Sequence, residues 1–418
     1  MIIKLKRLLL IFIYICIIPC TVLADDIQEE TELTNAEIQE TLEISCNNKD
    51  ILKDINSRAY IVIDRNSNRI LCGKNEFEKR KMASTTKIMT ATVVIENSNL
   101  SDTVEISKKA ANTGGSTLGV KTGDKITIKD LLYGLMLRSG NDCAVALAEY
   151  TGGSIEGFAE LMNQKACELG LENTHFETPH GLDSENHYTT AYELAIISNY
   201  AMNNKTFAQI VGTKNYTINI NGYPRNINNT NELLGNLNGI YGIKTGFTNG
   251  ANRCLVTCCK RNNMDIICVV LGADTKNYRT KDSIKLIEYV FKYFEPVNIE
   301  EKMKEEFLKW KNKNQSEFSI IKGKTNNIEL EMEELEHSTI PILKEQISNI
   351  DISVECENKL YAPLIKNAKI GNITLKINEE IIAKANILNK NQIEKKSPYD
   401  YLLLFFKNYK TYFNKLCF

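Results

Sequence analysis

The chain has 418 residues, which is too long for one ordinary domain and predicts two. A hydrophobic content of 43% and a charged content of 25% are typical of a soluble globular protein. The formal net charge of -1 gives no global basic field, so we expect no nucleic-acid partner.

The N-terminus has the organisation of an export signal. A basic start precedes an apolar run from Leu8 to Ile18, and Val22-Leu23-Ala24 places small residues at a cleavage position. We therefore expect residues 1–24 to be a signal peptide and the protein to be extracytoplasmic. An uncleaved membrane anchor is the alternative, but the apolar stretch is short for a span and Pro19 follows it.

The chain after the signal is acidic and then changes to a strand pattern. Residues 25–52 are interpreted as a solvated acidic leader rather than a binding element. Ala59–Asp64 and Arg69–Cys72, separated by a turn at Asn66-Ser67-Asn68, predict a β-hairpin. This hairpin opens the first folded unit, which we place at residues 53–295.

Ser84-Thr85-Thr86-Lys87 carries the first chemical signal. A serine and a lysine three positions apart share one face of a helix. Serine is a weak nucleophile that needs an adjacent base, and a neutral lysine can be that base. At a helix N-terminus the backbone N–H of Ser84 is also free to face a developing oxyanion. A lone S-x-x-K is usually an ordinary solvated helix face, so its meaning depends on further motifs.

Ser139-Gly140-Asn141 is expected to lie between two helices. The first runs from about Ile128 to Arg138, and the second begins at Asp142 with Asn141 as its N-cap. A pure capping role for Asn141 is the alternative to substrate contact, and the two roles are compatible.

Lys244-Thr245-Gly246 follows a predicted strand, Gly239–Ile243, and precedes another, Cys254–Cys258. An earlier K-T-G, Lys121-Thr122-Gly123, lies before Ser139 in a turn-forming run with no flanking strand pair. It is interpreted as a loop.

S-x-x-K, S-x-N and K-T-G in this order are the signature of the penicillin-interacting serine enzymes. The chain resembles the D-alanyl-D-alanine carboxypeptidase family of low-molecular-mass penicillin-binding proteins over nearly its whole length. The resemblance implies an α+β fold with a penicillin-binding/β-lactamase-like catalytic domain, whose antiparallel sheet is flanked by helices. It departs at Met82, where the family often has proline, and at Asn252-Arg253, where it often has an aromatic residue.

The family resemblance also implies an activity. Ser84 would attack peptidoglycan stem peptides ending in D-Ala-D-Ala, release the terminal D-alanine through an acyl-serine intermediate, and be acylated by β-lactam antibiotics. Lys87 would take the Ser84 proton, and Ser139 would pass it on to the departing nitrogen. The residues implied to bind the substrate are Asn141, Lys244, Thr245, Gly246, Phe247 and Arg279.

The implied binding roles differ from one residue to the next. Asn141 would hydrogen-bond the substrate backbone, and the N–H groups of Ser84 and Phe247 would form the oxyanion hole. Thr245 and Arg279 would meet the free carboxylate of the substrate, because a guanidinium fork suits a carboxylate. A surface position at a helix start is the alternative for Arg279. No cofactor or metal is implied.

The C-terminal part has a different pattern. Alternation at Ile328–Met332, Ile350–Val354 and Ile373–Ile377 predicts a small all-β domain at about residues 300–392, resembling the C-terminal domain of the family and acting as a stalk. Residues 397–418 predict an amphipathic helix started by Pro398, which we expect to lie on the outer face of the cytoplasmic membrane. Packing of this helix on the β domain is the alternative.

Histidine and cysteine suggest competing chemistries. A Ser-His-Asp hydrolase lacks support because no G-x-S-x-G elbow surrounds Ser84. Ten cysteines follow the signal, but most lie within apolar patterns, where a thiol behaves as a small hydrophobe, and none has C-x-x-C spacing. The sequence leaves the redox state of these cysteines open, because an exported chain often pairs its cysteines, and we expect no metal site.

Three other functions fit the same motifs. A D,D-endopeptidase would use the same residues but usually lacks the β domain. A class A-like β-lactamase shares the motifs, but no Glu-x-x-x-Asn segment follows Ser139 at the expected place. An inactive peptidoglycan-binding protein is a third alternative, although every motif residue is present.

Overall fold

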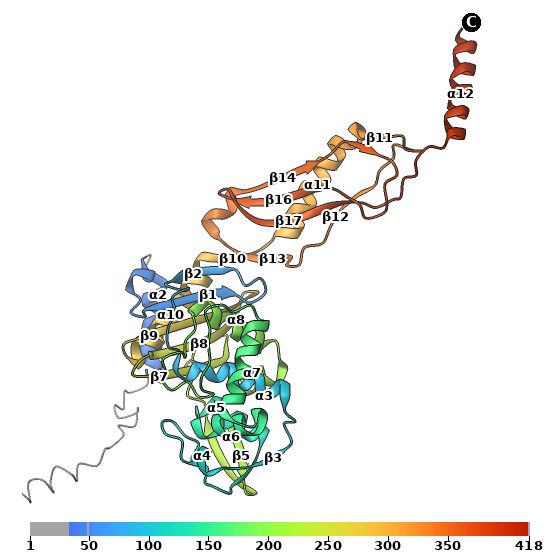
Figure 1. Ribbon diagram of the computed structural model, residues 1–418. Helices are drawn as coiled ribbons and strands as arrows, with labels where there is room; N and C mark the ends of the chain where they lie inside the picture. The colour runs from blue at the N-terminus through green and yellow to red at the C-terminus, as the bar shows by residue number, and fades with distance from the viewer. Residues whose placement is uncertain (1–32, 48–49, 417–418) are drawn as a thin grey trace, which may run out of the picture. The chain divides into compact units, whose positions relative to one another are not determined.

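The computed structural model describes residues 33–47 and 50–416 (Figure 1). The chain forms two units, the first ending at Lys292 and the second beginning at Tyr293. The predicted signal peptide, residues 1–24, lies outside the described residues. Within the described part of the chain, no helix is both long enough and apolar enough to cross a membrane.

An antiparallel sheet with strand order β2-β1-β9-β8-β7 forms the centre of the first unit. Its middle strands are nearly continuous apolar runs, and every residue of β1 is buried. The predicted hairpin is confirmed, because β1 pairs with β2. The strands are β1 (Ala59–Asp64), β2 (Ile70–Lys74), β7 (Ile240–Thr248), β8 (Asn252–Arg261) and β9 (Met264–Ala273).

A group of helices packs around α3 (Lys87–Asn97), whose residues from Lys87 to Val94 are all buried. The 3-10 turn η2 (Ala83–Thr86) leads into α3 and contacts β7 and β8. The first motif therefore lies against the strand that carries the third. The other helices of this unit are α4 (Lys108–Ala111), α5 (Ile128–Leu137), α6 (Asn141–Gly152), α7 (Ile155–Glu168), α8 (Ala191–Met202), α9 (Lys205–Val211) and α10 (Lys276–Tyr293).

Short elements complete the first unit. Two two-stranded sheets lie outside the main sheet, one formed by β3 and β4 and the other by the hairpin of β5 and β6. Their bounds, with that of a 3-10 turn before β1, are η1 (Ile51–Asp54), β3 (Thr103–Glu105), β4 (Lys125–Thr127), β5 (Asn215–Ile220) and β6 (Tyr223–Asn228).

The acidic leader is partly folded. Thr34 precedes helix α2 (Asn35–Asn47) and caps it. The Thr34 hydroxyl accepts from the Glu37 N–H at 3.3 Å, and the Glu37 carboxylate accepts from the Thr34 N–H at 2.8 Å. Ile38 is fully buried and Leu33 nearly so. The prediction of a solvated leader is therefore wrong for this part of the chain, because Leu33 and Ile38 are buried, although Ile44 is 51% exposed.

The second unit contains an antiparallel sheet with strand order β12-β17-β16-β14. The predicted β-rich domain is thus confirmed, and helix α11 (Ile299–Asn314) packs against β14 and β16. The remaining elements are β10 (Phe294–Asn298), η3 (Gln315–Glu317), β11 (Ser319–Ile321), β12 (Leu330–Met332), β13 (Thr339–Leu343), η4 (Lys344–Asn349), β14 (Ile350–Cys356), β15 (Lys359–Tyr361), β16 (Lys369–Ile377) and β17 (Glu380–Asn389).

The sequence pattern did not indicate α11, although its signals are ordinary. Asn298 caps it by accepting from the Glu301 N–H at 3.0 Å. Met303 and Phe307, four residues apart, are both buried. The predicted C-terminal helix is confirmed as α12 (Pro398–Leu416), and its residues 401–410 are exposed on all sides.

Candidate active site

The S-x-x-K motif brings a hydroxyl and an amine into contact. Ser84 lies in η2, Lys87 is the first residue of α3, and Lys87 Nζ is 2.7 Å from Ser84 Oγ. Ala83 has φ 49°, a left-handed conformation that costs a non-glycine residue roughly 1 kcal/mol or more. The amine is fully buried, whereas Ser84 is only half-buried. A substrate can therefore reach the hydroxyl while the amine stays dry.

The partners of Lys87 fit a neutral amine. Its Nζ also lies 2.7 Å from Asn141 Oδ1 and 2.8 Å from the His180 carbonyl oxygen. A neutral amine has two N–H groups for these two acceptors, and its lone pair then faces the Ser84 hydroxyl. Burial lowers the pKa of the Lys87 amine well below its ordinary value, and the charge of Lys244 lowers it further. The electrostatics therefore favour the base form, and the three contacts are compatible with it.

Asn141 contributes its side chain to the site rather than to a helix cap. Helix α6 begins at Asn141, and its N-cap residue Gly140 makes no side-chain cap bond. Asn141 Oδ1 accepts from Lys87, and its Nδ2 donates to the Gly114 carbonyl at 2.8 Å. The N-cap prediction for Asn141 is wrong, because the buried amide is already used on both sides. Ser139, also buried, has φ 58° in the turn before it.

Asp142 supports this loop and was missed as a functional residue. Its carboxylate accepts from the N–H groups of Leu118 at 2.9 Å, Gly119 at 2.7 Å and Val120 at 3.2 Å, and from its neighbour Cys143 at 2.9 Å. The carboxylate is buried, so these donors compensate its charge. They also tie the start of α6 to the loop after Gly114, which Asn141 contacts.

The K-T-G motif lies on β7, at the edge of the sheet that faces η2. The strand pair expected around it is present, because Lys244 pairs with Val256 and Phe247 with Arg253. A Cβ added at Gly246 would lie 3.1 Å from the Ser84 backbone nitrogen. A side chain here would force the Ser84 backbone to give way by a few tenths of an ångström. The motif and the nucleophile are therefore direct neighbours.

Lys244 is buried, and its Nζ donates to the Thr245 carbonyl at 2.9 Å. Burial and the charge of Arg279 lower the pKa of Lys244 to about 7. Thr245 shares a 2.9 Å hydrogen bond with the Thr230 hydroxyl. The Arg253 guanidinium lies 3.7 Å from the centre of the Phe247 ring. Arg253, which replaces the aromatic residue common in the family, therefore stacks on the residue that follows K-T-G.

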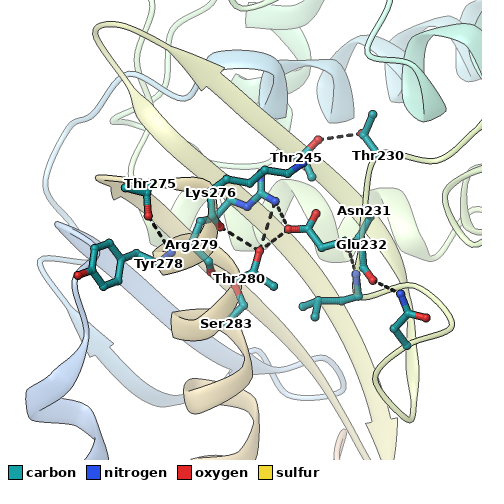
Figure 2. Close-up of polar contacts among 12 residues, drawn as sticks. Thr230, Asn231, Glu232, Thr245, Thr275, Lys276, Tyr278, Arg279, Thr280 and Ser283 are labelled. Atoms are coloured by element: carbon teal, nitrogen blue, oxygen red, sulfur yellow. Dashed lines mark hydrogen bonds and ion pairs between the residues drawn. The ribbon is translucent and has the colours of Figure 1, made fainter. Parts of the chain in front are cut away.

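Arg279 is buried, so the alternative of a surface position does not hold. It lies in the first turn of α10 and is 3% exposed. Figure 2 shows its guanidinium facing the Glu232 carboxylate, with which it forms an ion pair. Glu232 comes from the segment before β7, and no sequence motif pointed to it.

The histidines take structural positions. His180 contributes its backbone carbonyl to Lys87, while its ring Nδ1 accepts from the Leu182 N–H at 3.2 Å. The His187 ring contacts the Thr86 hydroxyl at 2.8 Å. Burial lowers the pKa of His180 to about 3 and that of His187 to about 4, so both rings are neutral. A histidine base at Ser84 has no support from these contacts.

The earlier K-T-G forms the turn that the sequence predicts, and the described cysteines are unpaired. Lys121-Thr122-Gly123 forms a turn in which the Lys121 N–H donates to Asp124 at 2.7 Å. The cysteines whose side chains are described are free thiols, namely Cys72, Cys143, Cys167, Cys254, Cys258, Cys259, Cys268 and Cys356.

Comparisons with known proteins agree with this arrangement. Residues 45–275 match the family model of D-alanyl-D-alanine carboxypeptidase, and residues 306–395 match the C-terminal domain of penicillin-binding protein 5. The chain is 32% identical to D-alanyl-D-alanine carboxypeptidase DacF of Bacillus subtilis, over 81% of this chain and 86% of that one. It is 34% identical to DacC of Escherichia coli, over 81% of this chain and 85% of the relative.

A solved structure extends the agreement to the fold. Penicillin-binding protein 5 from Haemophilus influenzae matches with a TM-score of 0.66 at 30% identity, covering 82% of this chain and 98% of that one. The chain therefore belongs to the D-alanyl-D-alanine carboxypeptidase family and is a serine-type enzyme of that family.

Proposed function

We propose that this chain removes the terminal D-alanine from peptidoglycan stem peptides ending in D-Ala-D-Ala, with Ser84 as nucleophile and Lys87 as general base. The observation that carries the proposal is the 2.7 Å contact between Ser84 Oγ and a buried amine whose two other partners are acceptors. A neutral Lys87 can take the Ser84 proton as the serine oxygen attacks the penultimate D-alanine carbonyl.

The reaction then proceeds by two acyl transfers. When the tetrahedral intermediate collapses, the C–N bond to the terminal D-alanine breaks, and its nitrogen receives a proton through Ser139. The acyl group remains as an ester on Ser84. Water hydrolyses this ester, releasing the shortened peptide and restoring the serine. A β-lactam would acylate Ser84 by the same attack.

The substrate carbonyl is proposed to sit between the N–H groups of Ser84 and Phe247. The close approach of Gly246 to the Ser84 nitrogen supports this oxyanion hole, because it brings the two donors to the same place. Asn141 is proposed to hydrogen-bond the substrate backbone in addition to its contacts with Lys87 and Gly114.

The free carboxylate of the substrate is proposed to bind beside Lys244, where Thr245 offers a hydroxyl and Arg279 a guanidinium. The charge of Arg279 contributes to the lowered pKa of Lys244, which supports a shared role of the two basic side chains. Two cations and a hydroxyl form a site that suits a carboxylate and disfavours an amide or an ester.

Two assays test the proposal. Mass spectrometry after labelling with a fluorescent penicillin should find the adduct on Ser84, and a pentapeptide ending in D-Ala-D-Ala should lose one D-alanine. Rapid turnover of penicillin would instead indicate a β-lactamase, opening of cross-linked dimers an endopeptidase, and a lack of reaction a binding protein.

We also propose that residues 1–24 export the protein, that residues 300–392 act as a stalk, and that α12 attaches the protein peripherally to the outer face of the cytoplasmic membrane. Support for attachment comes from the exposed apolar side chains of α12, including Leu402, Phe405, Phe406 and Tyr409, each more than half exposed.

The alternative, packing of α12 on the β domain, would cover these side chains. Deleting residues 397–418 should release the protein from membranes while preserving D-alanine release. Continued membrane binding would exclude this role of α12.

A further inference from the structure

Glu232 is a buried carboxylate that belongs to none of the three motifs. Its side chain is 3% exposed and that of Arg279 is 4% exposed. Glu232 Oε1 accepts hydrogen bonds from Arg279 Nη2 and from the Thr280 hydroxyl, so two consecutive residues of α10 hold it (Figure 2). A charged pair this deep in a protein is costly unless the two charges compensate each other.

The pair is incomplete as an arginine–carboxylate contact. Such pairs are often bidentate, with two parallel N–H donors meeting both oxygens. Among the described residues, the hydrogen bonds of the Arg279 guanidinium all leave from Nη2, and its Nε is buried without a partner. Glu232 Oε2 is likewise buried without a partner. The guanidinium is thus held at one corner, and its Nε–H has no acceptor among the described residues.

The pair also lies at one end of a series of basic side chains. The charge of Arg279 lowers the pKa of Lys244, and the charge of Lys244 lowers the pKa of Lys87. The positive charges of Arg279 and Lys244 attract a carboxylate, including that of the D-alanine product. Glu232 supplies a negative charge at the Arg279 end of the series.

We propose that Glu232 is a positioning residue that holds Arg279 by one corner and weakens its attraction for the terminal carboxylate of the substrate and for the carboxylate of released D-alanine. Glu232 acts through Arg279 and does not touch the reacting atoms. This inference rests on the proposed role of Arg279 in carboxylate binding.

The carboxylates of Glu232 and of the substrate would repel each other at Arg279, so removing the Glu232 charge should tighten substrate binding. Glu232→Gln keeps an oxygen for Arg279 and Thr280 but removes the charge. We expect the KM for a D-Ala-D-Ala pentapeptide and the inhibition constant of D-alanine both to fall about tenfold, as unit charges a few ångströms apart imply. Because the charge acts on substrate and transition state alike, kcat should change little. The KM for the same peptide ending in a C-terminal amide should stay unchanged.

A matched control separates this effect from a loss of stability. Glu193 is another buried glutamate of the first unit, and its carboxylate accepts from the Asn173 N–H at 2.9 Å. Glu193→Gln should lower thermal stability and leave both constants as in the wild type. A purely structural role for Glu232 predicts the same result for Glu232→Gln.

A second variant guards against misfolding of Glu232→Gln. Glu232→Asp retains the charge but withdraws it from Arg279 by one methylene, so we expect about a threefold fall in both constants. Unchanged or raised constants in the folded variants, with an active wild type, would overturn this inference alone. A wild type that releases no D-alanine would overturn the proposed function and the inference with it.

Discussion

The two units of the chain bury different kinds of side chain. The first unit buries charged residues next to one another, among them Lys87, Lys244, Arg279 and Glu232. In the described part of the second unit, Asn389 is the only buried polar residue, and the core consists of apolar side chains such as Ile373. Buried charge is costly, so it persists where it is compensated and used.

This difference locates the chemistry in the first unit. Its burial of Lys87 favours the neutral amine that a base requires, whereas the second unit has no comparable group among its described residues. Removing a charge or a nucleophile in the first unit should therefore change activity, and removing apolar contacts in the second should change stability alone. The following experiments test this contrast, beginning with the largest effect.

Ser84→Ala should lower the rate of D-alanine release by at least about 10⁴-fold, because the acyl-enzyme cannot form. The penicillin adduct should disappear as well. Ser198→Ala provides a matched control, since this buried serine of α8 donates to the Leu194 carbonyl at 2.7 Å, away from the site. Substantial turnover by Ser84→Ala would exclude the proposed nucleophile.

Lys87→Arg should slow acylation by about 10²–10⁴-fold, because a guanidinium stays protonated and cannot act as a base. The wild type should lose acylation rate as the pH falls through the lowered pKa of Lys87, about tenfold per pH unit below it. Stopped-flow acylation by a penicillin measures both effects. Lys205→Arg, at the exposed start of α9, should behave as the wild type. If Lys87→Arg still lost acylation rate at low pH, this pH dependence would belong to another group.

Asp142→Asn should lower kcat/KM by about tenfold and the free energy of unfolding by about 2 kcal/mol. The new amide group places a donor against backbone donors, leaving N–H groups of the loop from Leu118 to Val120 unpaired. Steady-state kinetics and thermal unfolding measure the two losses. Asp351→Asn, at an exposed position of β14, should change neither quantity. A stable Asp142→Asn variant with full activity would show that the loop is held by other contacts.

The KM for a carboxylate-terminated peptide should rise several-fold as the pH increases through about 7. Lys244 has a pKa of about 7 in the folded protein, so its positive charge is present below this pH and lost above it. The KM of an amide-terminated peptide should not follow this dependence. If the KM values of both peptides changed with pH in the same way, the titrating group would be the base Lys87 and not the carboxylate-binding Lys244.

Ile373→Ala should leave kcat and KM unchanged while destabilising the second unit by about 2–4 kcal/mol, because Ile373 is fully buried in an apolar core. Thermal unfolding monitored by calorimetry, alongside the D-alanine assay, separates the two properties. Ile365→Ala, at a position 68% exposed, is the control. A parallel loss of activity would show that the second unit contributes to catalysis.

Local sequence determined the elements that carry the chemistry. The spacing of Ser84 and Lys87, and the strand pair around Lys244, depend on residues close in the chain, so periodicity and turn signals predict them. The alternating strands of the second unit are predictable for the same reason. Helix α11 was missed because its polar sequence, with Met303 and Phe307 as its buried pair, gives a weak pattern.

Tertiary structure decided which partners these side chains meet. The contacts of Lys87 with Asn141 and with the His180 carbonyl join residues 54 and 93 positions apart, and Glu232 meets Arg279 across 47. No local pattern encodes such pairs, so the cap prediction for Asn141 was wrong and Glu232 was missed. The sequence by itself thus determined the fold class, and it predicted the nucleophile and its base. Burial, which sets the charge of Lys87 and gives Glu232 its partner, arises only when distant segments pack together.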